Sequence, residues 1–120
     1  MSGWNLALRF GLELAALTAL GAASWATTSG AIRVIAVVLV PVAAAVVWGV
    51  FNVIGDPSRS GKAPVVVAGW VRLLVELSIL GAGVIGFAVT GWRIASLVFL
   101  ALVVVHYAAS QPRLRWLLTQ

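Results

Sequence analysis

The chain has 120 residues, of which 62% are hydrophobic and 9% are charged, and its mean hydropathy is +1.11. A soluble domain is about half apolar and a quarter charged, so this composition excludes a soluble globular protein and predicts a protein of the lipid bilayer. The net charge of +5 arises from basic residues that mostly flank apolar runs, which favours membrane anchoring and excludes nucleic-acid binding.

The first apolar run covers residues 4–26 and is long enough to cross about 30 Å of hydrocarbon as a helix. Within it, the sequence LRFGLEL places Arg9 and Glu13 four residues apart, on one helical face. Glu13 would lie about 13–17 Å from the helix start, near the membrane midplane. Asn5 would lie one turn before Arg9 on the same face. The run lacks the basic start of a signal peptide, so we expect it to be retained.

The second apolar run covers residues 32–54 and has Pro41 in its middle, where the missing N–H group and the ring predict a helix kink. Small residues after this proline favour close packing against a neighbouring helix. Residues 55–64, GDPSRSGKAP, are polar and rich in glycine and proline, which predicts a loop. The glycine spacing in this loop differs from that of a phosphate-binding loop, so we exclude that function.

The third apolar run, residues 65–89, contains VRLLVEL, which places Arg72 and Glu76 at the same helical depth as the first pair. The fourth run, residues 92–110, follows after only two residues, so the last two spans should form an antiparallel hairpin. It contains His106, the single histidine of the chain. We expect His106 to form a hydrogen bond between helices, with a proton relay to a glutamate as the alternative.

These runs predict an all-α membrane protein, with one domain over residues 1–120 and four transmembrane helices in a bundle. The two charged pairs correspond under a shift of 63 residues (72 − 9), which indicates two similar two-helix halves in a parallel internal repeat. Basic residues are more numerous in the loop and at the C-terminal end than on the other side, so both termini should be cytoplasmic. A thin bundle with an internal duplication also favours a homo-oligomer.

Three segments carry a resemblance to a known family. They are NLALRFGLELAAL from Asn5, the W-G-x-F sequence from Trp48 to Phe51, and KAP followed by VRLLVEL from Lys62. The chain resembles the YrdB-like family of small four-helix bacterial membrane proteins, although its central loop is longer than the pattern of that family. The resemblance implies a multi-pass protein of the bacterial inner membrane and brings no established activity.

The buried charges leave two functions open. Each ionisable group at a helix centre costs about 2.5–3.5 kcal/mol on insertion scales, so the four charged side chains should turn inward and meet. They could form one neutral cluster that only fixes helix packing, in a structural or accessory membrane protein. Alternatively, the two glutamates could bind protons or cations in a small transporter or channel for an ion or small polar solute. We prefer transport narrowly, with this expected site: Glu13, Glu76, Arg9, Arg72 and Asn5.

No catalytic pattern is recognisable in the sequence. There is no spaced serine, histidine and aspartate, and the chain contains no cysteine that could act as a nucleophile or a metal ligand. A single histidine is weak evidence for a metal site. We therefore expect a protein that is not an enzyme and that binds no metal or other cofactor, and the ligand of the transport interpretation stays unknown.

Overall fold

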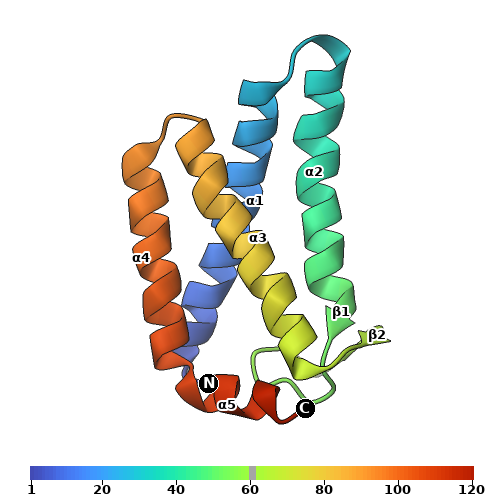
Figure 1. The fold of residues 1–120 in the computed structure, drawn as a ribbon, viewed down its shortest axis with the longest axis vertical. Coiled ribbons are helices and arrows are strands. Elements are labelled where there is room, and N and C mark those ends of the chain that lie inside the picture. The colour runs from blue at the N-terminus through green and yellow to red at the C-terminus, as the bar shows by residue number, and fades with distance from the viewer. Residues whose placement is uncertain (60–61) are drawn as a thin grey trace.

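The computed structural model describes residues 1–59 and 62–120, and this part of the chain is mostly helical (Figure 1). Residues 60 and 61 of the predicted loop lie outside the described residues. The described helices are α1 (Gly3–Thr27), α2 (Gly30–Val50), α3 (Gly69–Val89), α4 (Arg93–Ala109) and α5 (Gln111–Leu118). In the described ranges, α1, α2 and α3 are each long and apolar enough to cross a membrane. The pair α4 and α5 passes the same test together, although it is bent by 71°.

The helices are arranged around α1 and α3. Helix α1 packs against α2 and α3, while α4 packs against α3 and, less extensively, against α1. Helices α1 and α3 run away from the end of the molecule that holds both termini, and α2 and α4 return to it (Figure 1). Helix α5 lies across this end. At the opposite end the turns are tight, and Gly30 and Gly91 adopt the positive φ angles of 62° and 91° that such turns require.

The helix ends differ from the predicted spans on the side where the termini lie. Helix α2 ends at Val50 and α3 begins at Gly69, so both are shorter here than the predicted spans 32–54 and 65–89. Four of the residues left outside the helices pair as two short parallel strands, β1 (Phe51–Asn52) and β2 (Val65–Val66). Hydropathy measures affinity for an apolar environment and does not separate helical from extended backbone, which explains the difference.

Helix α5 was not predicted from the sequence. Helix α4 ends at Ala109, and α5 begins at Gln111 with Pro112 in its first turn, a position where the missing N–H group costs no helical hydrogen bond. The backbone of α5 comes so close to the start of α3 that a Cβ atom added to Gly69 would overlap the carbonyl group of Leu117. Glycine at this position therefore allows α5 to close the end of the molecule.

Small residues bring α1 and α3 close together. A Cβ atom added to Gly86 would lie 2.9 Å from the carbonyl oxygen of Ala19, and one added to Gly83 would lie 3.2 Å from Ala16. Such close approach of backbones is the usual means of helix association in a membrane, where burial of apolar surface gives little drive. The apolar core continues on both sides of this contact through Leu12, Leu80, Phe87, Phe99 and Val103.

Pro41 lies inside α2, and the helix continues through it without a break. The Cγ atom of Pro41 lies 3.5 Å from the position that a Cβ atom would take on Gly21 of α1. The proline ring thus packs where α1 has no side chain. The predicted kink does not divide α2 into two helices.

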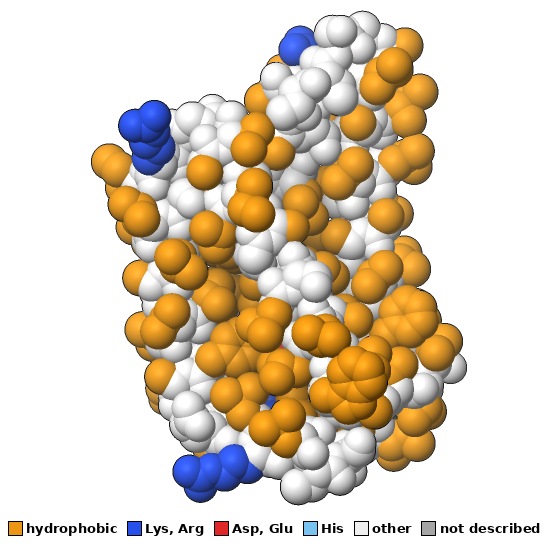
Figure 2. Space-filling view, in the orientation of Figure 1, with side chains coloured by type: hydrophobic (Ala, Val, Ile, Leu, Met, Phe, Trp, Pro, Cys, Tyr) orange, Lys and Arg blue, Asp and Glu red, His pale blue; other side chains and the backbone are white. Residues whose placement is uncertain are grey.

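The surface of the molecule separates by residue type along its long axis. Hydrophobic side chains cover the middle of the face in Figure 2, and basic side chains lie at the two ends. At the end opposite the termini, the guanidinium of Arg33 lies 4.5 Å from the ring centroid of Trp25, an arrangement suited to the interface between lipid and water. This distribution, together with the apolar helices, indicates a membrane protein.

Candidate functional site

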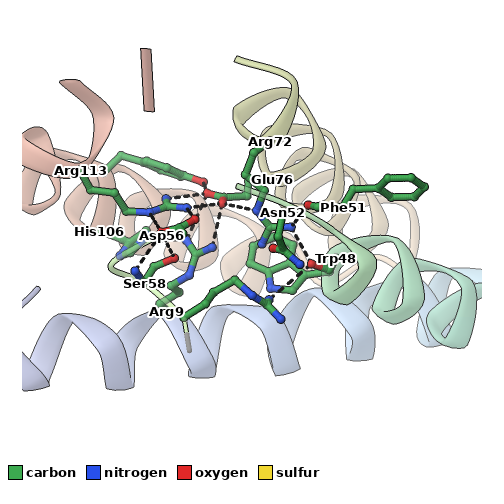
Figure 3. Close-up of polar contacts among 12 residues, drawn as sticks. Arg9, Trp48, Phe51, Asn52, Asp56, Ser58, Arg72, Glu76, His106 and Arg113 are labelled. Atoms are coloured by element: carbon green, nitrogen blue, oxygen red, sulfur yellow. Dashed lines mark hydrogen bonds and ion pairs between the residues drawn. The ribbon is translucent and has the colours of Figure 1, made fainter. Parts of the chain in front are cut away.

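Glu76 of α3 is the centre of a buried polar network (Figure 3). Its two carboxylate oxygens accept paired hydrogen bonds from Arg9, at 3.1 and 2.8 Å, and from Arg113, at 3.0 and 2.6 Å. The Nε of Arg72 and the hydroxyl of Tyr107 each donate one more at 2.8 Å. A carboxylate offers about four lone-pair positions, so its acceptor capacity is filled. The Glu76 side chain is 0% exposed.

Arg72 joins α3 to the end of α2. Its Nη1 donates to the carbonyl oxygens of Trp48, at 2.6 Å, and Phe51, at 2.9 Å. The last carbonyl groups of a helix lack partners within the helix and carry partial negative charge, so a cation there satisfies and stabilises them. The Nη2 of Arg72 is buried and has no hydrogen-bond partner among the described residues.

Arg113 joins α5 to the connection between α2 and α3. Its Nε and Nη2 donate to the two carboxylate oxygens of Asp56 at 2.8 and 2.7 Å, and Asp56 is 2% exposed. The backbone N–H and hydroxyl of Ser58 also donate to Asp56. Burial raises the pKa of Asp56, but the hydrogen bonds and the positive charge of Arg113 outweigh it and hold that pKa below its usual value. Arg113 therefore bridges two carboxylates that lie on different segments.

His106 of α4 completes the network on the side of α1. The Nδ2 of Asn5 donates to the hydroxyl of Ser110 at 2.8 Å, which leaves the Oδ1 of Asn5 to accept from His106 Nδ1 at 2.6 Å. His106 Nε2 then accepts from Arg9 at 3.4 Å, so the network assigns the neutral tautomer with hydrogen on Nδ1. His106 thus forms the expected hydrogen bond between helices. Among the described residues it has no hydrogen bond to either glutamate, and the alternative of a proton relay stays a prediction.

Trp48 separates the network from the space between α1 and α2. The guanidinium carbons of Arg9 and Arg72 each lie 4.9 Å from the centroid of its ring, within the range of cation–π attraction. The indole is 4% exposed, and its Nε1 has no hydrogen-bond partner among the described residues. Trp48 therefore helps to hold two buried cations and keeps one unused hydrogen-bond donor.

The expectation that both glutamates share one cluster is wrong, because Glu13 lies outside it. Glu13 is half-buried, and the described residues give it no hydrogen bond or ion pair, although Arg9 is one turn away on the same helix. Arg9 turns to Glu76 on α3 instead, where both ends of its guanidinium are bonded. Glu13 borders a hollow of about 60 Å³, lined also by Leu17, Ala44, Ala45, Trp48 and Ile79.

Four of the five expected site residues, Asn5, Arg9, Arg72 and Glu76, meet in the network. The network also contains four residues that were not predicted from the sequence: Asp56, Tyr107, Ser110 and Arg113. A signal for Asp56 was present, because it is one of only three acidic residues in a very apolar chain. Arg113 was counted only as a basic residue flanking a span, since the bend that turns α5 back over the helix ends carries no recognisable sequence pattern.

Comparisons with known proteins agree with the resemblance seen in the sequence. Residues 7–104 match the model of a family described as protein of unknown function (DUF2568). Over 116 residues the chain is 41% identical to the uncharacterized protein YrdB of Bacillus subtilis (strain 168), which covers 97% of this chain and 94% of that protein. No solved structure matches the chain. The predicted YrdB-like membership is confirmed, and the chain belongs to the DUF2568 family.

Proposed function

We propose that the protein crosses a bacterial inner membrane four times through α1–α4, with both termini and the connection between α2 and α3 on the cytoplasmic face. The two termini and this connection lie at one end of the molecule (Figure 1), which suits an even number of crossings. Arg59, Lys62 and Arg115 belong to segments at this end, against Arg33 and Arg93 at the other. Helix α4 has 17 residues and spans about 26 Å at 1.5 Å per residue, slightly less than the hydrocarbon core.

Within that membrane we propose a structural or accessory role, in which the Glu76 network locks the helix ends together. The observation that supports this role is the Glu76 carboxylate, which is 0% exposed and bonded to three arginines and Tyr107. Charge-assisted hydrogen bonds of this kind are roughly twice as strong as neutral ones, and a transported ion would have to displace several of them. A site that binds and releases an ion needs weaker, wetter coordination.

Two further features belong to the proposal. Helices α1 and α3 run in the same direction and carry the same motif, which supports a parallel repeat at the level of the fold, while their charged side chains have different partners. Helix α2 exposes most of its surface, since Trp48 is the one residue of this helix that is buried. We therefore propose that the protein forms a homo-oligomer and that the exposed surface of α2 contacts lipid or another subunit.

The experiment removes one cation and one anion together, so that the net charge stays the same. Glu76→Gln alone leaves three arginines facing an amide, whereas Arg9→Met combined with Glu76→Met removes a whole ion pair. Arg113 then keeps Asp56, and Arg72 keeps the carbonyl groups at the end of α2. If the network is only a lock, the double variant should regain much of the stability that Glu76→Gln loses, because the unpaired buried charge is the costly part.

Liposomes that contain each folded protein then separate a lock from a transport site. The double variant and the wild type should give the same permeability to K⁺, Na⁺ and Cl⁻ as empty liposomes. A flux through the wild type that disappears in the folded double variant would overturn the structural role and support transport through Glu76.

One observation favours transport as a second candidate. Glu13 is outside the lock and borders a hollow, so an ion or small polar solute could reach this carboxylate without displacing an arginine. In that case the flux would depend on Glu13 and not on Glu76. The same liposomes with Glu13→Gln distinguish the two glutamates.

A further inference from the structure

We propose that Glu13 and the hollow beside it form a hydrated site that takes up and releases a proton. The site is separate from the Glu76 network and does not depend on its structural role. Experiments could rule out the structural role of the Glu76 network while the Glu13 site exists. They could also rule out the Glu13 site while the structural role holds.

The shape of the hollow supports water in it. Its volume is about 60 Å³. A cavity of about 10–15 Å³ is enough for one water molecule. The lining offers one hydrogen-bond acceptor, the Glu13 carboxylate, and the rest of it is apolar or indole surface. Water in the hollow would give the Glu13 carboxylate the hydrogen bonds that the described residues do not supply.

The chemistry of the lining selects a proton over a metal ion. Glu13 is the only charged group of the lining, and the other side chains, apart from Trp48, are aliphatic. Among the described residues no group of three or more histidine, cysteine, aspartate or glutamate side chains could hold a metal ion. Metal cations such as Ca²⁺ and Mg²⁺ require six or more oxygen ligands, whereas a proton requires only the carboxylate and a path of water.

The charges around Glu13 couple its proton to the network. Arg9 acts on Glu13 from α1, Arg72 and Glu76 act from α3, and Arg59 acts from the connection after α2. Helix α2 contributes no charge, since its lining residues are alanine and tryptophan.

Proton uptake and release at Glu13 change the balance of charge in the interior of the protein. In the network, Arg9, Arg72 and Arg113 carry three positive charges against two negative charges on Asp56 and Glu76, so the balance is +1 (3 − 2). Glu13 and Arg59 are both half-buried beside the network, so with Glu13 ionised the local total is +1 (4 − 3), and with Glu13 protonated it is +2. Proton uptake by Glu13 therefore adds one positive charge to this region, and proton release removes it.

Infrared difference spectroscopy on the full chain in lipid nanodiscs tests the site. The wild type should show a protonated-carboxyl band that appears as the pH is lowered and shifts promptly when H₂O is exchanged for D₂O. The band should vanish in Glu13→Gln and persist, at a changed position, in Glu13→Asp.

A matched variant tests the role of water. Ala44→Leu places a larger side chain in the lining while leaving Glu13 in place, and it should slow the D₂O shift. Two results would overturn the proposal: no pH-dependent carboxyl band wherever circular dichroism shows an intact fold, or a band that survives in Glu13→Gln and so belongs to another acid.

A chemical measurement covers the case in which the variants do not fold. An apolar carbodiimide reacts with protonated carboxyl groups, so treatment of the wild type followed by mass spectrometry should label Glu13 and leave Glu76 unlabelled. Labelling of Glu76 with Glu13 left unmodified would contradict the proposal directly.

Discussion

The motif R-x-x-x-E-L occurs twice, from Arg9 to Leu14 in α1 and from Arg72 to Leu77 in α3, and the two copies differ in their surroundings. In α3 the glutamate is bonded to its own arginine and to arginines from α1 and α5. In α1 the arginine points to the other helix, and Glu13 faces a hollow.

Sequence spacing permits an ion pair, but the neighbouring helices decide whether it forms. Glu76 lies where α1, α4 and α5 all contribute donors: Arg9, Tyr107 and Arg113. The hollow at Glu13 is bordered by α2, which supplies two alanines and an indole. A guanidinium that can reach either acid gains more from the site where other groups already fix the carboxylate.

The largest expected effect is at the centre of the network. Glu76→Gln should lower the free energy of unfolding by about 3–5 kcal/mol, because it leaves buried arginines without their shared anion. Unfolding in mixed detergent micelles, followed by circular dichroism, measures the change. If Glu76→Gln lowered the free energy of unfolding no more than Glu13→Gln does, the two motifs would contribute equally to stability.

Removing the cation that α5 contributes should weaken the surroundings of the α3 motif, although Glu76 keeps Arg9, Arg72 and Tyr107. Arg113→Met leaves Asp56 with only Ser58 as a donor, and we expect a loss of about 2–3 kcal/mol. Adding Asp56→Asn should recover part of this loss, since the amide tolerates burial without a cation better than the carboxylate does. If Asp56→Asn and Arg113→Met are simply additive, the two side chains are not coupled.

The close contact beneath α5 gives an independent way to displace Arg113. Gly69→Ala places a methyl group against the backbone of Leu117, so α5 must shift, at a cost of about 1–3 kcal/mol. Gly81→Ala is the matched control in the same helix, where nothing lies within 4 Å of the new atom. The control should be neutral or stabilising by up to about 1 kcal/mol, because alanine favours the helix. Equal unfolding curves for the two variants would contradict the close contact.

Acid should weaken the network through Asp56, which lies outside the proposed spans. Its pKa in the folded protein is below the ordinary value of 3.8, so its contribution to stability is complete above pH 3.8 and is lost as the pH falls through the lower folded value. Unfolding measured as a function of pH should show this decline in the wild type and a smaller one in Asp56→Asn. Parallel pH profiles would show that Asp56 is not held by Arg113.

The smallest expected effect is at the other glutamate. Glu13→Gln should change the free energy of unfolding by less than about 0.5 kcal/mol, since no bonded partner loses its charge. The same unfolding measurement applies, with Glu76→Gln as its counterpart. A decrease of several kcal/mol in the free energy of unfolding would show that Glu13 stabilises the fold as Glu76 does, and that the two motifs have similar roles.

Much of the fold follows from particular residues in the sequence. The apolar runs and their breakers locate α1, α2, α3 and α4 to within a few residues, because each helix must satisfy its own backbone in an apolar environment. The cost of immersing charge also predicts that Arg9, Arg72 and Glu76 turn inward, as they do. The family membership was visible in the same motifs.

The tertiary structure alone decided which charges meet. The 71° bend before α5 brings Arg113 onto Glu76, and the glycine and alanine contacts between α1 and α3 bring Arg9 across to the same carboxylate. The contacts of this network that join different segments connect residues 21 to 105 positions apart in the chain, from Arg72 with Phe51 to Asn5 with Ser110. Local spacing contains no information about such distant partners, and a buried carboxylate selects among all the donors that the packed helices bring within reach.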